Sequence, residues 1–177
     1  MVCPLRFKLT IAAFLVLFAA SFVEAQKARE ILNPAIDMKG FLKLSREAAK
    51  HREKRRLTED DFIAMAKESG VVILDARSKQ RFDELHVAGA VNLSFPDITV
   101  DSLATLFPDK NQTILIYCNN NFVGEPQAFA TKVAPASLNL STYISLYTYG
   151  YRNVYELGPL LDVETTRLEL VKSDRSL

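Results

Sequence analysis

The chain has 177 residues, with 22 lysines and arginines against 21 aspartates and glutamates, and its formal net charge is +1. This balance lacks the basic excess of a typical nucleic-acid-binding protein, so no nucleic-acid partner is predicted.

The amino terminus has the pattern of a signal peptide. Arg6 and Lys8 precede an uncharged apolar run over residues 9–23, and a small-residue cleavage pattern ends at Ala25. Residues 1–25 are therefore predicted to be removed on export, to the periplasm or by secretion. A permanent anchor is the weaker alternative, because a helix needs about twenty apolar residues to cross a bilayer. The rest of the chain is long enough for one domain but not for two.

A basic helical arm is predicted over residues 26–56. Seven basic residues lie between Lys43 and Arg56, against two glutamates. The main interpretation is a solvated helix that leads into the domain, and docking on an anionic membrane or on a partner is the alternative. His51 has no second histidine or cysteine at ligand spacing, so we predict no metal site.

The domain is predicted to run over residues 57–163. Thr58 has the character of a helix N-cap, acidic residues follow it in the first turn, and Gly70 ends the helix. Short apolar segments then predict strands of a parallel sheet with helical crossovers: residues 71–74, 90–92, 113–117 and 153–155. These patterns favour an α/β domain.

Cys118 directly follows the apolar run over residues 113–117, at the expected carboxyl end of a strand, where open α/β sheets bind ligands. Cys3 leaves with the signal peptide, so the mature chain has no internal disulfide. A lone thiol is either buried and inert or retained for its reactivity. Here the loop amides and a helix opening at Glu125–Pro126 are predicted to favour the thiolate. The loop residues predicted to bind substrate are Asn119, Asn120, Asn121, Phe122, Val123 and Gly124.

Several motifs resemble, in combination and in order, the signatures of the rhodanese homology domain. Residues 74–77 and 85–92 are similar to its two amino-terminal signatures, and the dipeptide that ends at Cys118 resembles the strand with the active cysteine. Residues 152–157 are similar to the closing strand, and the resemblance covers roughly residues 57–162. It implies a small parallel-sheet rhodanese-like domain flanked by helices.

The resemblance also implies sulfur transfer without a metal or cofactor. The Cys118 thiolate would take the outer sulfur of a small donor, hold it as a persulfide and pass it to a thiol acceptor or to cyanide. By the same resemblance Asp75, Arg77 and His86 mainly maintain the fold.

The loop departs from the family pattern, which has glycine and arginine where this chain has Asn121 and Val123. The next basic residue after Cys118 is Lys132, so thiosulfate is a doubtful donor. Related phosphatases have arginine at the position of Gly124, so phosphatase activity is not predicted. The alternative function is a noncatalytic rhodanese-fold module used for binding or redox sensing.

Two features follow the loop. Residues 133–151 predict an extra amphipathic helix, whose aromatic part, residues 140–151, packs on the sheet or, as the alternative, forms a surface for a protein partner. Residues 164–177 form a charged tail without a strong pattern, and we expect it to fray.

Overall fold

The computed structural model describes residues 33–173, and the predicted signal peptide lies outside them. The chain divides into two units after Asp37, and the described helices and strands belong to the larger unit, which begins at Met38. Within residues 33–173, no helix combines the length and the apolar character that crossing a bilayer requires.

The described part of the chain contains five α-helices, nine strands and three short 3-10 helices. The α-helices are α2 (Met38–Arg52), α3 (Glu59–Ala66), α4 (Lys79–Glu84), α5 (Val100–Leu106) and α6 (Leu138–Thr148). The strands are β1 (Arg56–Leu57), β2 (Val72–Asp75), β3 (His86–Val87), β4 (Val91–Asn92), β5 (Ile114–Tyr117), β6 (Phe122–Val123), β7 (Val154–Leu157), β8 (Leu161–Asp162) and β9 (Leu170–Val171). The connections contain the short 3-10 helices η1 (Phe95–Asp97), η2 (Asn119–Asn121) and η3 (Ala134–Ala136).

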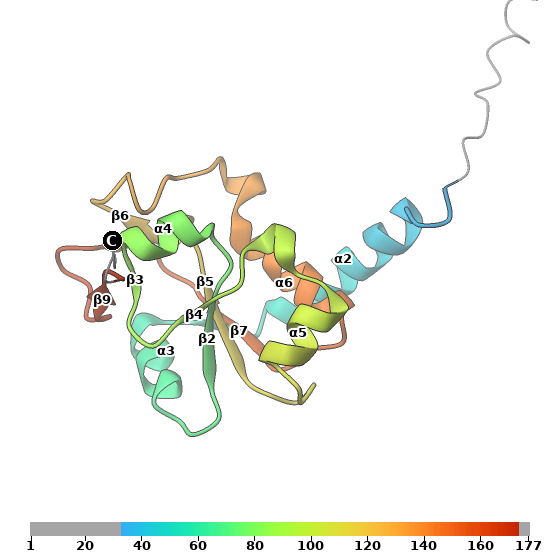
Figure 1. Ribbon diagram of the computed structural model, residues 1–177, viewed down its shortest axis with the longest axis horizontal. Coiled ribbons are helices and arrows are strands. Elements are labelled where there is room, and N and C mark those ends of the chain that lie inside the picture. The colour runs from blue at the N-terminus through green and yellow to red at the C-terminus, as the bar shows by residue number, and fades with distance from the viewer. Residues whose placement is uncertain (1–32, 174–177) are drawn as a thin grey trace, which may run out of the picture. The chain divides into compact units, whose positions relative to one another are not determined.

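A five-stranded parallel sheet, in the order β1-β7-β5-β2-β4, forms the centre of the domain (Figure 1). The four predicted strands are confirmed as β2, β4, β5 and β7. Strand β1 was not predicted, because a two-residue strand that begins with an arginine contains no apolar run. The predicted α/β fold, with a parallel sheet flanked by helices, is confirmed.

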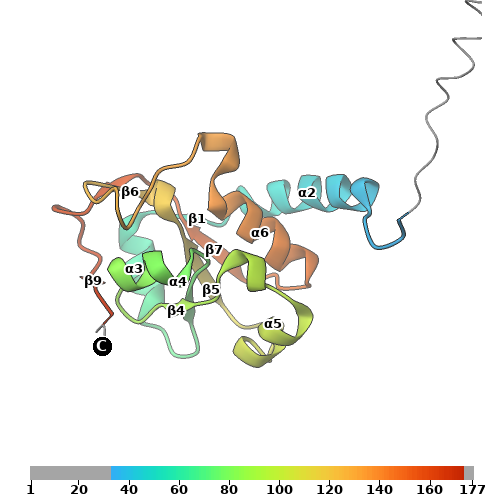
Figure 2. The ribbon, with the colours of Figure 1, turned by 45° about the horizontal axis from the view of Figure 1, so that its top comes forward.

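Side chains of the central strand β5 alternate between two cores, one on each face of the sheet. Ile114 and Ile116 belong to the core that α2, α5 and α6 cover, and Leu115 and Tyr117 belong to the core with Phe62 of α3. Figures 1 and 2 show α5 and α6 on one side of the sheet and α3 on the other. Because both faces are covered, the sequence of β5 is an unbroken apolar run.

Helix α2 confirms the helix predicted within the basic arm, and it packs on the domain. The buried carboxylate of Glu156 in β7 accepts a hydrogen bond from Arg52 Nε at 2.7 Å and one from Arg56 Nε at 3.1 Å. His51 Nδ1 lies 2.8 Å from the hydroxyl of Tyr143 on α6. Part of the positive charge of the arm is therefore used in contacts with the sheet and α6, and the domain bounds given by the sequence stay a prediction.

The predicted extra helix is confirmed as α6. Tyr143 and Tyr151 from the aromatic stripe are buried, and the Tyr151 hydroxyl donates to the backbone oxygens of Leu103 at 3.1 Å and Phe107 at 2.8 Å. Burial raises the pKa of Tyr143 to about 12. These two rings contribute to packing within the domain, and a partner surface on residues 140–151 stays a prediction.

The helix predicted to open at Glu125–Pro126 does not form. One helix-type hydrogen bond links Phe129 N to Glu125 O at 2.8 Å, and residues 124–133 contain no regular element. Phe129 is buried against Phe122, with 4.5 Å between ring centroids. This packing returns the chain to the core after one turn, so the prediction from a polar loop followed by proline was wrong here.

The segment after residue 163 is more ordered than we expected. Strand β9 pairs with β3 in antiparallel fashion, and Leu168 is buried in the core beside α3. Glu59 at the start of α3 accepts hydrogen bonds from Thr166 Oγ1 at 2.5 Å and from Arg167 N at 2.7 Å. The expected fraying is therefore not seen up to Ser173, because contacts distant in sequence fix a segment that has no periodic pattern of its own.

Candidate active site

Cys118 lies at the carboxyl end of β5, as the sequence predicted, and its side chain is buried with 1% of its surface exposed. It is the N-cap residue of η2, and Asn120 N donates to Sγ at 3.4 Å. The hydroxyl oxygen of Ser137, which precedes α6, also lies 3.4 Å from Sγ. The Cys118 sulfur is therefore in contact with one backbone amide and one hydroxyl group.

Asn121 stands where the family pattern has glycine, and its buried side chain holds the cysteine loop in place through hydrogen bonds. Its Oδ1 accepts a hydrogen bond from Cys118 N at 2.9 Å, and its Nδ2 donates to the backbone oxygens of Leu157 at 2.8 Å and Pro159 at 3.1 Å. Asn139 Nδ2 of α6 donates to the same Oδ1 at 3.0 Å. A glycine could make none of these side-chain contacts, so the asparagine fixes Cys118 against the end of β7 and the start of α6.

Two further asparagines bind the segment that precedes α6, which we call the strap, residues 130–137. Asn119 Nδ2 donates to the backbone oxygen of Ala130. Asn120 Nδ2 donates to Lys132 O at 2.7 Å, and Asn120 Oδ1 accepts from Lys132 N at 3.1 Å. The strap therefore lies against the cysteine loop, with Ser137 in contact with Cys118 and the Lys132 backbone bound to Asn120.

The other predicted substrate-binding residues point elsewhere. Phe122 is fully buried between Tyr117 and Phe129. Val123 is exposed in β6, which pairs with β8. Gly124 has a φ of +101°, and a Cβ there would lie 2.7 Å from Val163 Cγ2, so this position requires glycine. Among these six residues, all within the described part of the chain, only Asn120 forms a hydrogen bond with Sγ.

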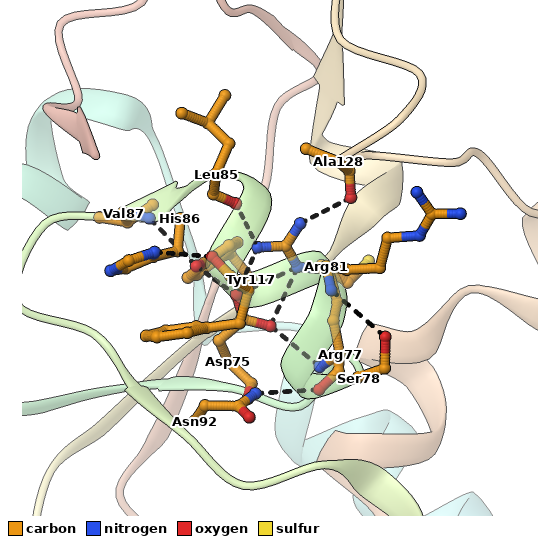
Figure 3. A network of polar contacts seen from close by, with 12 residues as sticks. Asp75, Arg77, Ser78, Arg81, Leu85, His86, Val87, Asn92, Tyr117 and Ala128 are labelled. Carbon is orange, nitrogen blue, oxygen red and sulfur yellow. Dashed lines mark hydrogen bonds and ion pairs between the residues drawn. The ribbon is translucent and has the colours of Figure 1, made fainter. Parts of the chain in front are cut away.

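The predicted fold-maintaining residues Asp75 and Arg77 form a buried network next to β5 (Figure 3). Arg77 Nη2 donates to Asp75 Oδ2 at 2.6 Å and to Leu85 O at 2.8 Å, and Nη1 donates to Ala128 O at 2.8 Å. The Tyr117 hydroxyl donates to Asp75 Oδ2 at 2.5 Å. Burial, together with the Asp75 charge, raises the pKa of Tyr117 well above its usual value. Arg77 thus joins β2, the start of β3 and the segment after the loop.

His86 is likewise engaged within the fold. Its Nδ1 lies 2.7 Å from Phe82 O, and its ring stacks on the Phe82 ring with 3.7 Å between centroids. Asn92 supports the same region, because its Nδ2 donates to the backbone oxygens of Asp75 at 3.0 Å and Arg77 at 2.9 Å. Within residues 33–173, no hydrogen bond links His86 to Cys118, and the structural role of His86 stays a prediction.

The sequence interpretation missed Ser137. A serine directly before an apolar helical pattern is a signal for an N-cap, but within the described chain its side chain makes no capping hydrogen bond to α6. Its hydroxyl instead reaches Cys118, nineteen positions earlier in the chain. No short-range pattern predicts that contact. Within residues 33–173, no group of three His, Cys, Asp or Glu side chains is placed to hold a metal ion.

Comparisons with known proteins bear on this site. Residues 58–157 match the family model described as the rhodanese-like domain. The thiosulfate sulfurtransferase PspE of Escherichia coli is 27% identical over 96 residues, which are 54% of this chain and 77% of that protein. A solved structure of a rhodanese with anions from E. coli is 25% identical, and the match covers 58% of this chain and 98% of that one, with a TM-score of 0.40. The BH2092 protein of Bacillus halodurans is 23% identical, with coverages of 72% and 85% and a TM-score of 0.48.

The family match alone covers more than half of the chain and includes β2, the cysteine loop and β7. The chain belongs to the rhodanese-like domain family.

Proposed function

We propose that this protein is a sulfurtransferase or persulfide carrier in which Cys118 is the nucleophile. The observation that carries the proposal is the position of the Cys118 thiol at the carboxyl end of β5, in contact with Asn120 N and Ser137 Oγ. Ligands of open α/β sheets bind at this edge. Membership of the rhodanese-like family and the similarity to a named thiosulfate sulfurtransferase support the same chemistry.

The reaction consists of two displacements at sulfur. The Cys118 thiolate attacks the outer sulfur of a donor persulfide, a bond forms between Sγ and that sulfur, and the donor S–S bond breaks. The donor leaves as a thiolate with the electron pair of the broken bond. An acceptor thiolate then attacks the outer sulfur on Cys118, takes it as a new persulfide and restores the Cys118 thiolate. No external oxidant or reductant is needed.

Ser137 and the amino-terminal end of α6 stabilise negative charge at the Cys118 sulfur, because residues 119–124 contain no basic side chain. The eleven-residue α6 begins directly after Ser137, and the amino-terminal end of a helix favours negative charge nearby. A terminal persulfide sulfur carries that charge, and the Ser137 hydroxyl can donate to it. We therefore assign Ser137 a role in stabilising the persulfide, which loop amides supply in the family pattern.

Access to Sγ requires movement of the strap, because Cys118 is buried and the strap contacts it through Ser137. The asparagine contacts with Ala130 and Lys132 hold the strap in place. Opening these few hydrogen bonds near the surface is a local event that costs far less than global unfolding. The donor then reaches the thiol between the strap and the carboxyl end of the sheet.

The test follows sulfur from donor to acceptor thiol for thiosulfate, mercaptopyruvate and polysulfide. The wild-type protein is compared with Cys118→Ser and Ser137→Ala, and Ser141→Ala, an exposed serine on α6, is the matched control. We expect transfer to disappear in Cys118→Ser, to slow in Ser137→Ala by about ten- to a hundredfold for one lost hydrogen bond to a charged sulfur, and to persist in Ser141→Ala. Transfer by Cys118→Ser at the wild-type rate would rule the proposal out.

A further inference from the structure

The solvent side of α2 carries large apolar side chains. Met38, Phe41 and Leu42 are 63%, 53% and 44% exposed. Their spacing of three and four residues places them along one stripe of the helix, and Ser45 continues it. The Ser45 hydroxyl donates to Phe41 O at 2.7 Å, so the helix backbone satisfies this polar group. We call Met38, Phe41, Leu42 and Ser45 the outer stripe.

The other side of α2 is fixed to the domain. Ala48 is fully buried, and the side chains of His51 and Arg52 contact Tyr143 and Glu156. Figures 1 and 2 show α2 beside α6 at the edge of the domain, with its amino-terminal turns extending past α6. Because these contacts fix the rotation of α2 about its axis, the outer stripe cannot turn into the core, and within residues 33–173 its apolar side chains stay exposed.

Basic side chains border the outer stripe. Four of them are exposed and repeat at a spacing of three or four residues, so they form a second stripe on the helix: Lys39, Lys43, Arg46 and Lys50. Within the described part of the chain, none of the four forms an ion pair. Glu47 is the one acidic residue of α2. The helix therefore presents a positive face next to an apolar one.

This combination favours a lipid surface over a protein as the partner of α2. A helix that lies in the headgroup region of a bilayer has lysine and arginine on its polar face and residues such as phenylalanine and leucine on the other. Anionic headgroups attract each basic side chain near the surface. Protein interfaces, in contrast, are poor in lysine, and three of the four basic residues bordering the outer stripe are lysines.

We propose that α2 docks the domain on an anionic membrane surface, with the outer stripe among the acyl chains and the four basic side chains at the lipid phosphates. The helix lies along the surface, since no helix within residues 33–173 is long and apolar enough to cross a bilayer. Docking also sets the orientation of the domain, because His51 and Arg52 hold α2 on it. The inference does not depend on the chemistry proposed for Cys118.

The test uses the fact that the chain contains no tryptophan. Phe41→Trp places an indole in the outer stripe, and Val100→Trp places one at an exposed site on α5 as the control. The protein is expressed with its own amino terminus and purified as the cell processes it. Emission is recorded with vesicles of phosphatidylglycerol and phosphatidylcholine, and with phosphatidylcholine alone. An indole that leaves water emits at shorter wavelength, so we expect a blue shift in Phe41→Trp with the anionic vesicles alone, and none in Val100→Trp.

The contribution of charge is measured in the Phe41→Trp background. Lys43→Gln/Lys50→Gln removes two basic side chains beside the outer stripe. Lys67→Gln/Lys172→Gln changes the net charge equally at two exposed lysines outside α2 and is the matched control. The first pair should weaken vesicle binding about twenty- to thirtyfold, since each lysine near an anionic surface contributes about fivefold in affinity. The second pair should weaken it far less.

The apolar contact is tested in the same background. Leu42→Ser should weaken vesicle binding about three- to tenfold, because part of a leucine side chain no longer enters the acyl region. Leu160→Ser, at an exposed leucine after β7, should leave binding unchanged. No shift with either vesicle, an equal shift with both, an equal shift in Val100→Trp or equal losses in the two lysine pairs would overturn the proposal. A blue shift before lipid is added, together with a dimer mass in sedimentation, would overturn it in favour of a second copy of this chain on the outer stripe.

Discussion

Replacement of Arg77 by methionine should destabilise the domain severely. Asp75 is fully buried, and Arg77, which is 3% exposed, supplies its ion pair and also donates to Leu85 O and Ala128 O. Methionine has a similar length but no donor, so the carboxylate would lose its guanidinium partner inside the protein. Breaking a buried pair in this way costs about 3–5 kcal/mol. That is a large share of the roughly 5–15 kcal/mol by which a domain is stable.

The assay is urea unfolding followed by far-UV circular dichroism, since the chain contains no tryptophan to report by fluorescence. Lys79→Met is the control, because the Lys79–Asp83 pair lies at the surface, where screening by solvent leaves such a pair little effect on stability. The double variant Asp75→Asn/Arg77→Met should recover part of the loss, because it removes the unpaired charge. A loss below about 1 kcal/mol in Arg77→Met would refute the reasoning, since it would mean that Asp75 does not depend on its partner.

Three further predictions concern the strap, α2 and the carboxyl-terminal segment. Asn120→Ala removes both hydrogen bonds to Lys132 and should speed alkylation of Cys118 by iodoacetamide; an unchanged rate would mean that the strap does not control access. Burial and the nearby charges of Arg55 and Arg152 lower the pKa of His51, so the unfolded chain takes up a proton more readily, and stability should fall as the pH drops below about 6.5. His51→Gln should reduce that dependence in urea titrations on either side of this pH, and an identical dependence in the variant would contradict the assignment. Glu59→Gln weakens the contacts with Thr166 and Arg167 and should increase amide hydrogen exchange in β9 without changing exchange in β5; equal protection of β9 in both proteins would show that Glu59 does not fix this segment.

Much of the fold could be predicted because its central strands are buried on both faces. The apolar segments that became β2 and β5 have almost no exposed side chain, and such a burial pattern leaves a direct trace in the sequence. Thr58 was identified as an N-cap from its local pattern, and its hydroxyl accepts from Asp61 N at 3.2 Å. Buried strands and a helix N-cap could thus be predicted, because each is determined by residues that are close together in the sequence.

The missed features depend on contacts between distant segments. Strand β9 pairs with β3 through Val87 and Leu170, which are far apart in the sequence, and the short apolar stretch around Leu170 is too weak a pattern to predict a strand. The predicted helix at Glu125–Pro126 is absent because Phe129 packs on Phe122. Local propensity is overridden in both places by tertiary packing.

The candidate site divides in the same way. The position of Cys118 after β5 could be predicted, because the apolar run over residues 113–117 marks a buried strand that ends directly before it. The contact of Ser137 with Sγ, and the approach of Lys132 through Asn120, could not, since the strap has no periodicity and its place is set by asparagine side chains. Counting residues from Cys118 to Lys132 suggested a loop without a cation nearby, whereas the folded chain binds the Lys132 backbone to Asn120, two residues after the thiol.

The most direct test of the central claim is the intact mass of the protein after brief exposure to an organic persulfide, followed by addition of an acceptor thiol. We predict that the wild-type protein gains one sulfur atom, that peptide mapping places it on Cys118, and that the acceptor removes it. Cys118→Ser should gain none. A wild-type protein that gains no sulfur, although iodoacetamide reaches Cys118 under the same conditions, would contradict the account.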